Sequence, residues 1–256
     1  MAQYTEREQQ ILTILEQQQY VDNIELSQLL NCSVVTIRTA IRSLEKQGAL
    51  IRTHGGALPT PPMISVSLPA GNIFKDRENK LKIAEKAYQY INDRDTIILD
   101  DSSNSFYLAQ VIKQYADKYL VVITNSLYVA CELANIDNIE IMLIGGLISG
   151  KIPASMGESA IDMMKNFRAS KAFIGVHGVH PEIGITSIGN DQMQIKKLIF
   201  EIAKEVYVLT CSNKFVTEHL FVSAPLNKVH KIITDKGISL KFYNQLKNVT
   251  SVDVVK

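Results

Sequence analysis

After residue 76 the chain repeats one pattern, in which an apolar stretch rich in β-branched residues is followed by a segment with helical periodicity. The apolar stretches are TIILD (96–100), LVVIT (120–124), IEIMLIG (139–145), KAFIGV (171–176), EVYVLT (205–210) and KIITD (231–235). The helical segments include ENKLKIAEKAYQYI and NDQMQIKKLIFEIAK. Strands that are apolar throughout must be covered on both faces, which favours a mostly parallel sheet between two layers of helices. We therefore predict an α/β domain over residues 76–256.

The front of the chain follows a different pattern. Thr5 and Glu8 have the spacing of a helix-capping box, and Ile11, Ile14 and Leu15 then fall on one helical face. A second short helix is predicted over 25–31. Four of the seven prolines follow in the stretch LPTPPMISVSLPAG, which disfavours a helix. We predict a small domain over 1–58, a linker over 59–75 and the α/β domain after it.

The last part of the small domain reads SVVTIRTAIRSLEKQGALIRTHGGA. A helix capped by Ser33 would bury Ile37, Ala40, Ile41 and Leu44 and end at Gly48. Its other face collects cations and hydroxyls, and a short strand with a Gly-Gly turn then suits the wing of a winged helix-turn-helix. The predicted DNA contacts are Ser33, Val35, Thr36, Arg38, Thr39, Arg42, Ser43, Lys46, Arg52 and His54.

A solvated amphipathic helix is the plainer alternative for this stretch. Residues 1–58 carry five Lys/Arg against six Asp/Glu, and the whole chain has a formal net charge of only +1. The cations are nevertheless concentrated on one helix and the wing, as in the basic footprint of a DNA-binding domain. The sequence therefore predicts local contact with double-stranded operator DNA and leaves the solvated helix open.

Polar loops follow several of the predicted strands. In an open parallel sheet, ligands bind at the carboxyl ends of the strands, where helix N-termini attract anions. Hydroxyl and amide side chains can hydrogen-bond a phosphate, and lysine supplies the opposite charge. Glycine lets a ligand come close to the backbone, and carboxylates suit sugar hydroxyls. The predicted effector contacts are Asp100, Asp101, Ser102, Ser103, Asn104, Ser105, Thr124, Asn125, Gly145, Gly146 and Lys214. Helix capping alone is the plainer alternative for the Ser and Asn residues.

The run ELSQLLNCSVVTIRTAIRSLEKQGALIRTHGGA resembles the DeoR family of bacterial transcriptional regulators. The resemblance continues through LDDSSNS, TNS, IGG, MGESA, KAFIGVHGV, GITS, SNKF and ITD. It implies a winged helix-turn-helix followed by a Rossmann-like sensor domain, similar in fold to ribose-5-phosphate isomerase, that binds a phosphorylated sugar. The expected function is a regulator, more specifically a repressor, of carbohydrate metabolism genes. Thr39-Ala40 departs from the Arg-Asp pair usual after TIR in this family, which removes one arginine from the DNA-facing surface.

An isomerase-like enzyme with an accessory DNA-binding module is the main alternative. Isomerisation of a sugar needs a positioned base, and the related isomerases carry an Asp-Gly-Ala-Asp-Glu loop where this chain reads GVHGVHPE, with only Glu182 acidic. His177 and His180 form an isolated H-x-x-H, which is a weak metal signal. We therefore expect no enzyme, no catalytic residue, no metal and no cofactor. A scaffold that serves only assembly remains a third possibility.

Composition also bears on where the protein is located and on its disulfides, metal binding and assembly. The N-terminus is polar, and the most apolar stretch is about half the length needed to span a bilayer, so we expect a cytoplasmic protein without membrane contact. Cys32, Cys131 and Cys211 are odd in number and far apart, which argues against disulfides and zinc. A homo-oligomer, a dimer or larger, is expected because paired DNA half-sites need two recognition helices.

Overall fold

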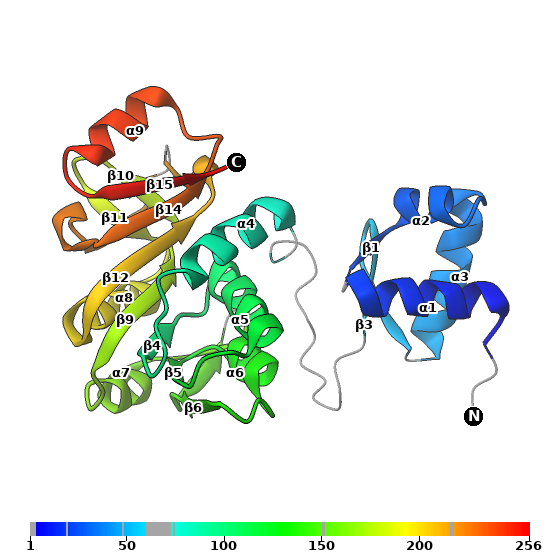
Figure 1. The fold of residues 1–256 in the computed structure, drawn as a ribbon, viewed down its shortest axis with the longest axis horizontal. Coiled ribbons are helices and arrows are strands. Elements are labelled where there is room, and N and C mark those ends of the chain that lie inside the picture. Colours follow the sequence, from blue (N-terminus) through cyan, green and yellow to red (C-terminus); the bar gives the residue numbers. More distant parts are fainter. Residues whose placement is uncertain are drawn as a thin grey trace. The chain divides into compact units, whose positions relative to one another are not determined.

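The computed structural model of the protein describes residues 4–18, 20–47, 49–59, 73, 75–149, 152–215 and 218–256. The chain forms two compact units, Met1–Phe74 and Lys75–Lys256 (Figure 1). Most of the predicted linker, and Gly48 as the predicted helix end, lie outside the described residues. None of the described helices is long and apolar enough to cross a membrane.

The first unit is a helical domain with a small antiparallel sheet in the order β1-β3-β2. Its elements are α1 (Glu6–Gln18), β1 (Val21–Asp22), α2 (Asn23–Leu29), α3 (Val34–Lys46), β2 (Leu50–Arg52) and β3 (Gly56–Pro59). The predicted capping box is confirmed, since the backbone N–H of Thr5 donates to Glu8 Oε2 at 2.8 Å and that of Glu8 donates to Thr5 Oγ1 at 3.3 Å. The second helix begins two residues earlier than predicted, because Asp22 caps it by accepting from the N–H of Ile24.

The three helices of this unit pack around one apolar core. α1 contributes Ile11 and Leu15, α2 contributes Leu26, and α3 contributes Ile37, Ile41 and Leu44. The predicted buried face of α3 is therefore confirmed, with Ala40 half-buried at its edge. Because this face is fixed against α1 and α2, the opposite side of α3 faces outward within the unit.

The second unit is built on a seven-stranded sheet whose paired neighbours all run parallel. The strands are β4 (Thr96–Leu99), β5 (Leu120–Thr124), β6 (Ile139–Leu143), β9 (Ala169–Gly175), β12 (Ala203–Thr210), β14 (Lys231–Asp235) and β15 (Ser251–Val255), in the order β15-β14-β12-β9-β4-β5-β6. All six predicted strands are present. β15 was not predicted, because an edge strand alternates polar and apolar residues and lacks the fully apolar pattern.

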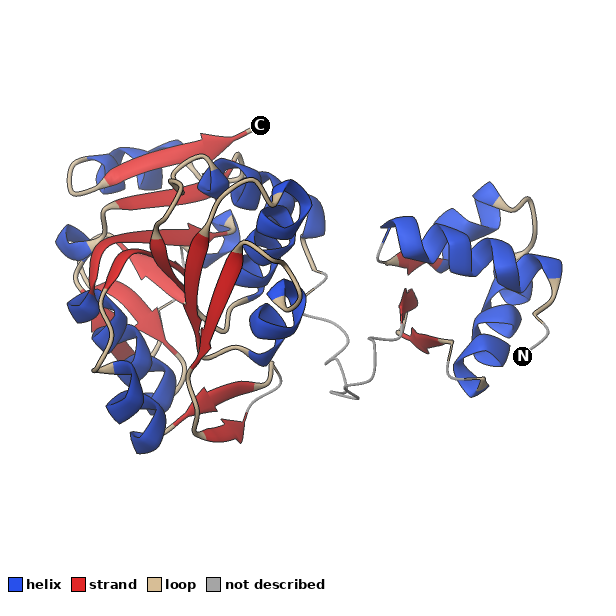
Figure 2. Ribbon diagram, turned by 60° about the horizontal axis from the view of Figure 1, so that its bottom comes forward, coloured by secondary structure: helices blue, strands red, loops and turns tan. Residues whose placement is uncertain are grey.

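Helices cover both faces of this sheet (Figures 1 and 2). The helices are α4 (Arg77–Tyr88), α5 (Ser103–Tyr115), α6 (Leu127–Leu133), α7 (Glu158–Met164), α8 (Asn190–Ile202) and α9 (Leu240–Lys247). α4, α5 and α6 pack in a row on one face, while α7, α8 and α9 join a core with the strands on the other. The predicted α/β layering is thereby confirmed.

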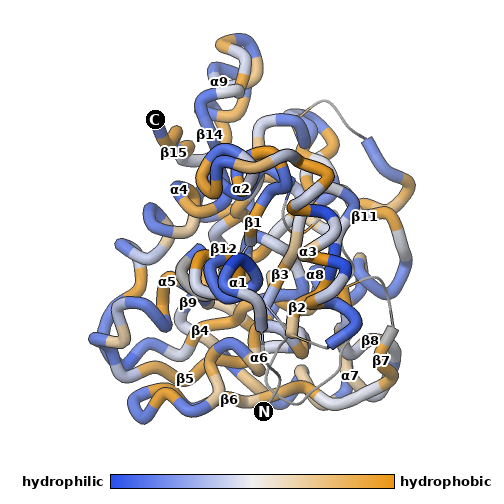
Figure 3. The backbone as a smooth tube through the Cα atoms, turned by 90° about the vertical axis from the view of Figure 1, so that its right-hand side faces the viewer, coloured by the Kyte–Doolittle hydropathy of each residue, from blue (hydrophilic) through white to orange (hydrophobic). Residues whose placement is uncertain are grey.

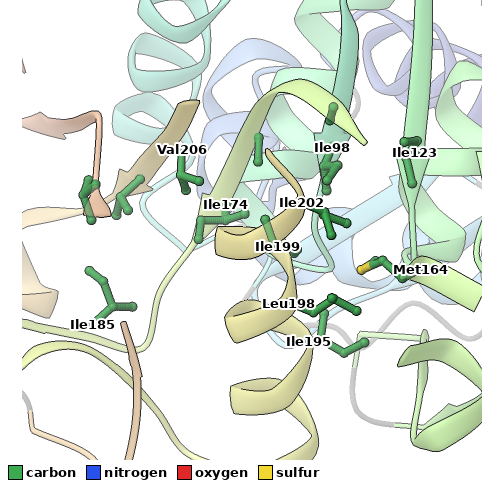
Figure 4. Packing of buried hydrophobic residues seen from close by; sticks show 14 of the residues in the cluster. Ile98, Ile123, Met164, Ile174, Ile185, Ile195, Leu198, Ile199, Ile202 and Val206 are labelled. Carbon is green, nitrogen blue, oxygen red and sulfur yellow. The ribbon is translucent and has the colours of Figure 1, made fainter. Parts of the chain in front are cut away.

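The core beneath α8 shows why the strands are apolar throughout. α8 places Ile195, Leu198, Ile199 and Ile202 against strand residues that include Ile98 (Figure 4). The flanking residues of β4, Ile97 and Leu99, are also buried and by strand alternation face the opposite helix layer. The apolar colouring along β4 and β5 in Figure 3 reflects this double burial.

Two small antiparallel sheets complete the unit. β7 (Leu147–Ser149) pairs with β8 (Ala154–Met156), and β11 (Gly184–Ser187) lies between β10 (Gly178–His180) and β13 (Phe221–Ala224). These short strands were not predicted. The important point for function is the order of the main sheet, because the chain lays down β5 and β6 on one side of β4 and then crosses to β9 on the other. A ligand site is expected at such a switch point, outside the carboxyl ends of β4 and β9.

Candidate functional site

The outward side of α3 carries much of the predicted DNA-contact set. Arg38, Thr39, Arg42 and Lys46 are exposed, and Val35 retains 71% of its surface. Val35 lies one helical turn before Arg38, and an exposed apolar side chain there suits contact with a thymine methyl group in a major groove. Ser33 caps α3, its hydroxyl accepting from the N–H of Thr36 at 3.1 Å. Ser33 and Thr36 thus fix the N-terminus of the helix.

Three residues of the set have local partners that limit their role. Ser43 is half-buried and hydrogen-bonds to Glu8, a contact that leads the causes holding the pKa of Glu8 below its usual value. Ser43 therefore faces α1, a correction to its predicted place on the outward face. The Thr39 hydroxyl donates to the carbonyl of Val35 at 2.9 Å. Arg52 on β2 is exposed and pairs with Glu45 at 3.0 Å, while His54 lies exposed in the turn after β2.

In the second unit, the loop after β4 meets the end of β9. Asp100 is fully buried there and accepts hydrogen bonds from the N–H groups of Ser102 and Gly175, the hydroxyl of Ser105 and the ammonium of Lys196. Lys196 Nζ lies 2.6 Å from Asp100 Oδ2 and also donates to the carbonyl of Gly175 at 2.7 Å. A Cβ on Gly175 would sit 2.3 Å from the Ser102 Cβ, so only glycine permits this close approach. We call the ends of β4 and β9, with the loops that follow them, the strand-end site.

The buried pair of Asp100 and Lys196 is charged. Burial alone would raise the pKa of Asp100, but the charge and hydrogen bond of Lys196 outweigh it and hold the pKa below its usual value. Burial opposes the charge of Lys196 as well, yet Asp100 raises its pKa. The sequence prediction that Asp100 binds sugar hydroxyls is corrected, because both of its oxygens already accept internal hydrogen bonds. Ser105 is likewise committed, because its hydroxyl oxygen lies 2.6 Å from Asp100 Oδ1 and 3.0 Å from the carbonyl oxygen of Phe173, and its one proton can serve either acceptor.

The remaining residues of the β4 and β5 loops line the same edge of the sheet. Ser102 caps α5, Ser103 is half-buried in its first turn, and Thr124 accepts from the N–H of Ser126. Asn104 and Asn125 are buried and donate through Nδ2 to the carbonyls of Leu209 and Ser155 respectively. Among the described residues, the Oδ1 atom of each has no hydrogen-bond partner. These two oxygens are therefore buried acceptors without a partner.

Gly145 and Gly146 have a structural explanation. They lie between β6 and β7, and a Cβ on Gly146, at a φ of +147°, would sit 3.1 Å from the Ala160 Cβ of α7. The N–H of Gly145 donates to the sulfur of Met163 at 3.2 Å. Close packing of this turn on α7 accounts for Gly146, whereas a Cβ on Gly145 would meet only the sulfur of Met163 at 3.8 Å, an ordinary contact. The predicted approach of the two glycines to a ligand has no support from these contacts.

Asp101 is the carboxylate of the site that has an unusual environment. Burial is the main cause that raises its pKa to about 6, with Lys196 opposing and Asp100 reinforcing the rise, and the Asn125 side chain hydrogen-bonds to it. The carboxyl of Asp101 thus takes up a proton at a higher pH than an ordinary aspartate, because its pKa is about 6. Of the two adjacent aspartates, Asp101 is the one suited to meeting a ligand hydroxyl.

We predict that Asp101→Asn stabilises the second unit at pH 7.5. In the unfolded chain an Asp titrates near 3.9, so above pH 6 the group is ionised in both states and its burial costs on the order of 1–3 kcal/mol. As the pH falls from 6 to 4 the folded state takes up the proton first, and the penalty disappears. Thermal unfolding should give a higher unfolding temperature for the variant than for the wild type at pH 7.5, and a smaller difference at pH 5.0. A variant less stable at pH 7.5 would contradict the assignment.

Lys214 lies half-buried at the end of η1 (Ser212–Lys214), the turn after β12. Asp235 fixes this turn by accepting from the N–H of Ser212 at 2.7 Å and from its hydroxyl at 2.8 Å. The charge of Lys214 reaches the strand-end site, since burial, Lys196, His219 and Lys214 together lower the pKa of His177 to about 4. Contact of Lys214 with a ligand beside the loops after β4 and β5 stays a prediction.

Sequence reasoning missed several residues of the site. Lys196 lies on the buried face of α8. The sequence could have indicated this, because Lys196 is three positions before Ile199 and so falls on the apolar face of the helix. Lys80, buried on α4, is close enough that Lys214 contributes to lowering its pKa, after burial as the main cause. Among the described residues no group of three or more His, Cys, Asp or Glu side chains could hold a metal ion.

These features define a class: a helix-turn-helix unit with a β2–β3 wing, followed by an α/β unit whose polar strand-end loops meet at the switch point of its sheet. The sequence profile described as "DeoR-like helix-turn-helix domain" matches residues 7–60, and that described as "DeoR C terminal sensor domain" matches residues 75–236. The chain belongs to the DeoR family and is a DNA-binding transcriptional regulator. The prediction of a regulator over an enzyme is thereby confirmed.

Relatives agree along nearly the whole length. A putative aga operon transcriptional repressor of Escherichia coli O157:H7 is 29% identical over 237 residues, which cover 91% of this chain and 87% of that protein. The HTH-type transcriptional repressor GlcR of Bacillus subtilis strain 168 is 32% identical over 226 residues, 88% of this chain and 86% of that protein. A solved D-ribose-5-phosphate isomerase in complex with phospho-erythronic acid matches with a TM-score of 0.42 and 19% identity over 55% of this chain and 54% of that one.

Proposed function

We propose that this regulator binds a phosphorylated sugar at the strand-end site and, in response, changes its affinity for operator DNA near carbohydrate metabolism genes. The observation that carries the proposal is that the loops after β4, β5 and β9, at the switch point of the sheet, hold three buried polar atoms without a hydrogen-bond partner among the described residues, which are Asn104 Oδ1, Asn125 Oδ1 and His177 Nδ1. The charge of Lys214 acts on the last of these residues. A lysine suits a phosphate, and the Oδ1 atoms of Asn104 and Asn125 suit hydroxyl donors.

Repression is the proposed sign of control. The two relatives described above carry the name repressor, one of them of an aga operon. An effector can change DNA affinity only to the extent that it favours one arrangement of the protein over another. The strand-end site couples several elements through Asp100, which joins the β4 loop, β9 and α8, so a ligand bound there can bias all three.

The working form is proposed to be a dimer or a larger homo-oligomer. A single α3 reads one half-site, and paired half-sites one helical turn apart require two such helices. Sedimentation of the full chain with and without a DNA duplex containing paired half-sites tests this part of the proposal.

Lys214→Ala should weaken binding of phosphorylated sugars by roughly 10- to 100-fold, because a charge-assisted hydrogen bond contributes about 1.5–3 kcal/mol. Calorimetry of the full chain with phosphorylated and unphosphorylated sugars measures the change. The matched control is Lys228→Ala, since Lys228 also ends a short turn after a strand but is exposed. DNA affinity without sugar should stay at the wild-type value. Equal binding of phosphorylated and unphosphorylated sugars by the wild type would overturn the phosphate site.

A further inference from the structure

His177 follows β9 directly and lies at the strand-end site. Its Nδ1 atom is buried and, among the described residues, has no hydrogen-bond partner. The Nε2 atom of His219 is 3.3 Å from the His177 carbonyl oxygen, and the two rings lie edge to face with centroids 6.0 Å apart. The His219 ring thus packs beside the His177 ring and contacts its backbone, while the buried Nδ1 of His177 has no hydrogen-bond partner among the described residues.

The surroundings keep this imidazole neutral. Burial is the main cause that lowers the pKa of His177 to about 4, and Lys196 on α8, His219 and Lys214 on η1 add to it, with Asp100 opposing. These groups come from the elements packed around the ring. A neutral imidazole offers one nitrogen that donates and one that accepts. It can therefore bind a neutral polar group without changing charge.

His180, three residues later, provides a contrast. Its Nδ1 accepts from the N–H groups of Glu182 and Ile183, both at 3.2 Å, and its Nε2 lies 3.3 Å from Glu218. Nδ1 is thus committed to the turn after β10, and Nε2 to Glu218. Of the two histidines in the H-x-x-H, only His177 has a nitrogen left for a ligand.

We propose that His177 is a specificity-determining residue, whose Nδ1 hydrogen-bonds a hydroxyl on the carbon chain of the effector. The inference rests on the proposed function and adds to it the part of the ligand that this side chain recognises. A hydroxyl both donates and accepts, so it satisfies Nδ1 in either tautomer, whereas a phosphate oxygen is better served by the ammonium of Lys214. An unpaired buried nitrogen is costly, which favours a partner in the bound state.

This contact separates one phosphorylated sugar from another. A site that hydrogen-bonds a ligand hydroxyl binds poorly an analogue that lacks it, because the buried polar group is then left unpaired. His177 should consequently act on the carbon chain of the ligand, while Lys214 acts on the phosphate. The two residues can be distinguished by a ligand that has phosphate but no carbon chain.

The experiment is calorimetry of the full chain with ribose 5-phosphate, glucose 6-phosphate, fructose 6-phosphate and fructose 1-phosphate, and with inorganic phosphate directly or by competition. For the sugar phosphate that the wild type binds best, His177→Ala should weaken binding about three- to tenfold, the value of one neutral hydrogen bond. Its affinity for inorganic phosphate should not change. His177→Asn should recover part of the loss, since an amide places a hydrogen-bonding atom near Nδ1, and His180→Ala should bind as the wild type.

Three results would overturn the inference. His177→Ala could bind the best sugar phosphate as the wild type does, it could lose inorganic phosphate to the same degree, or His177→Asn could bind as weakly as the Ala variant while unfolding at the wild-type temperature. Failure of the proposed function looks different, because the wild type would then bind no member of the panel. Thermal unfolding of each variant separates loss of the contact from loss of the fold.

Discussion

The double substitution Arg38→Ala and Arg42→Ala should reduce DNA affinity by roughly 100-fold or more, since each charge-assisted hydrogen bond to a phosphate contributes about 1.5–3 kcal/mol. Both side chains are exposed on the side of α3 opposite its buried face of Ile37 and Leu44. Loss of two phosphate contacts should also lower the slope of log affinity against log salt by about two. Binding is measured by gel shift across salt concentrations, on a duplex that the wild type selects from a random library.

The matched control is Arg7→Ala, which removes an exposed arginine of the same unit from α1. It should leave the slope near the wild-type value. Neither substitution touches the apolar core, so thermal unfolding should not change beyond the few tenths of a kcal/mol usual for surface residues. An unchanged salt slope for the double variant would show that α3 does not contact the DNA.

The fold could be read from the sequence wherever one periodicity dominated. The six apolar runs became strands because parallel strands between two helix layers must be apolar on both faces. α3 was found because Ser33 caps it and its apolar residues recur with helical spacing. β15 was not predicted because its outer side is solvated. The short strands β10, β11 and β13 were not predicted because three or four residues are too few to show a strand periodicity.

The site was harder to predict, because adjacency in the sequence does not show which way a side chain points. Asp100 and Asp101 looked equivalent, yet Asp100 is saturated by internal donors while Asp101 meets Asn125. Lys196 is almost a hundred positions from its partner Asp100 and was hidden in an amphipathic helix. Gly146 matched a ligand motif but serves packing on α7. Such assignments depend on contacts between distant segments, which local patterns do not record.

The largest stability effect is expected from Lys196→Ala. Lys196 and Asp100 are almost completely buried, and their charged atoms lie 2.6 Å apart. Removing the lysine leaves a carboxylate in the core without its cation, which costs about 3–5 kcal/mol. For a unit of this size that corresponds to a fall of roughly 10 °C in the unfolding temperature. Differential scanning calorimetry of the full chain measures the second unit's transition.

Lys197→Ala is the matched control, because Lys197 is the next residue of α8 and is exposed. It should unfold within about 0.5 kcal/mol of the wild type. A second variant, Lys196→Met combined with Asp100→Asn, removes both charges and should recover much of the loss, since the cost arises from the unpaired charge.

The pH dependence of the unfolding temperature gives a further check. In Lys196→Ala the carboxyl of Asp100 no longer has its cation, so protonation relieves the penalty and the deficit relative to wild type should shrink as the pH falls. Equal unfolding temperatures for Lys196→Ala and Lys197→Ala would show that the buried pair does not hold the β4 loop, β9 and α8 together.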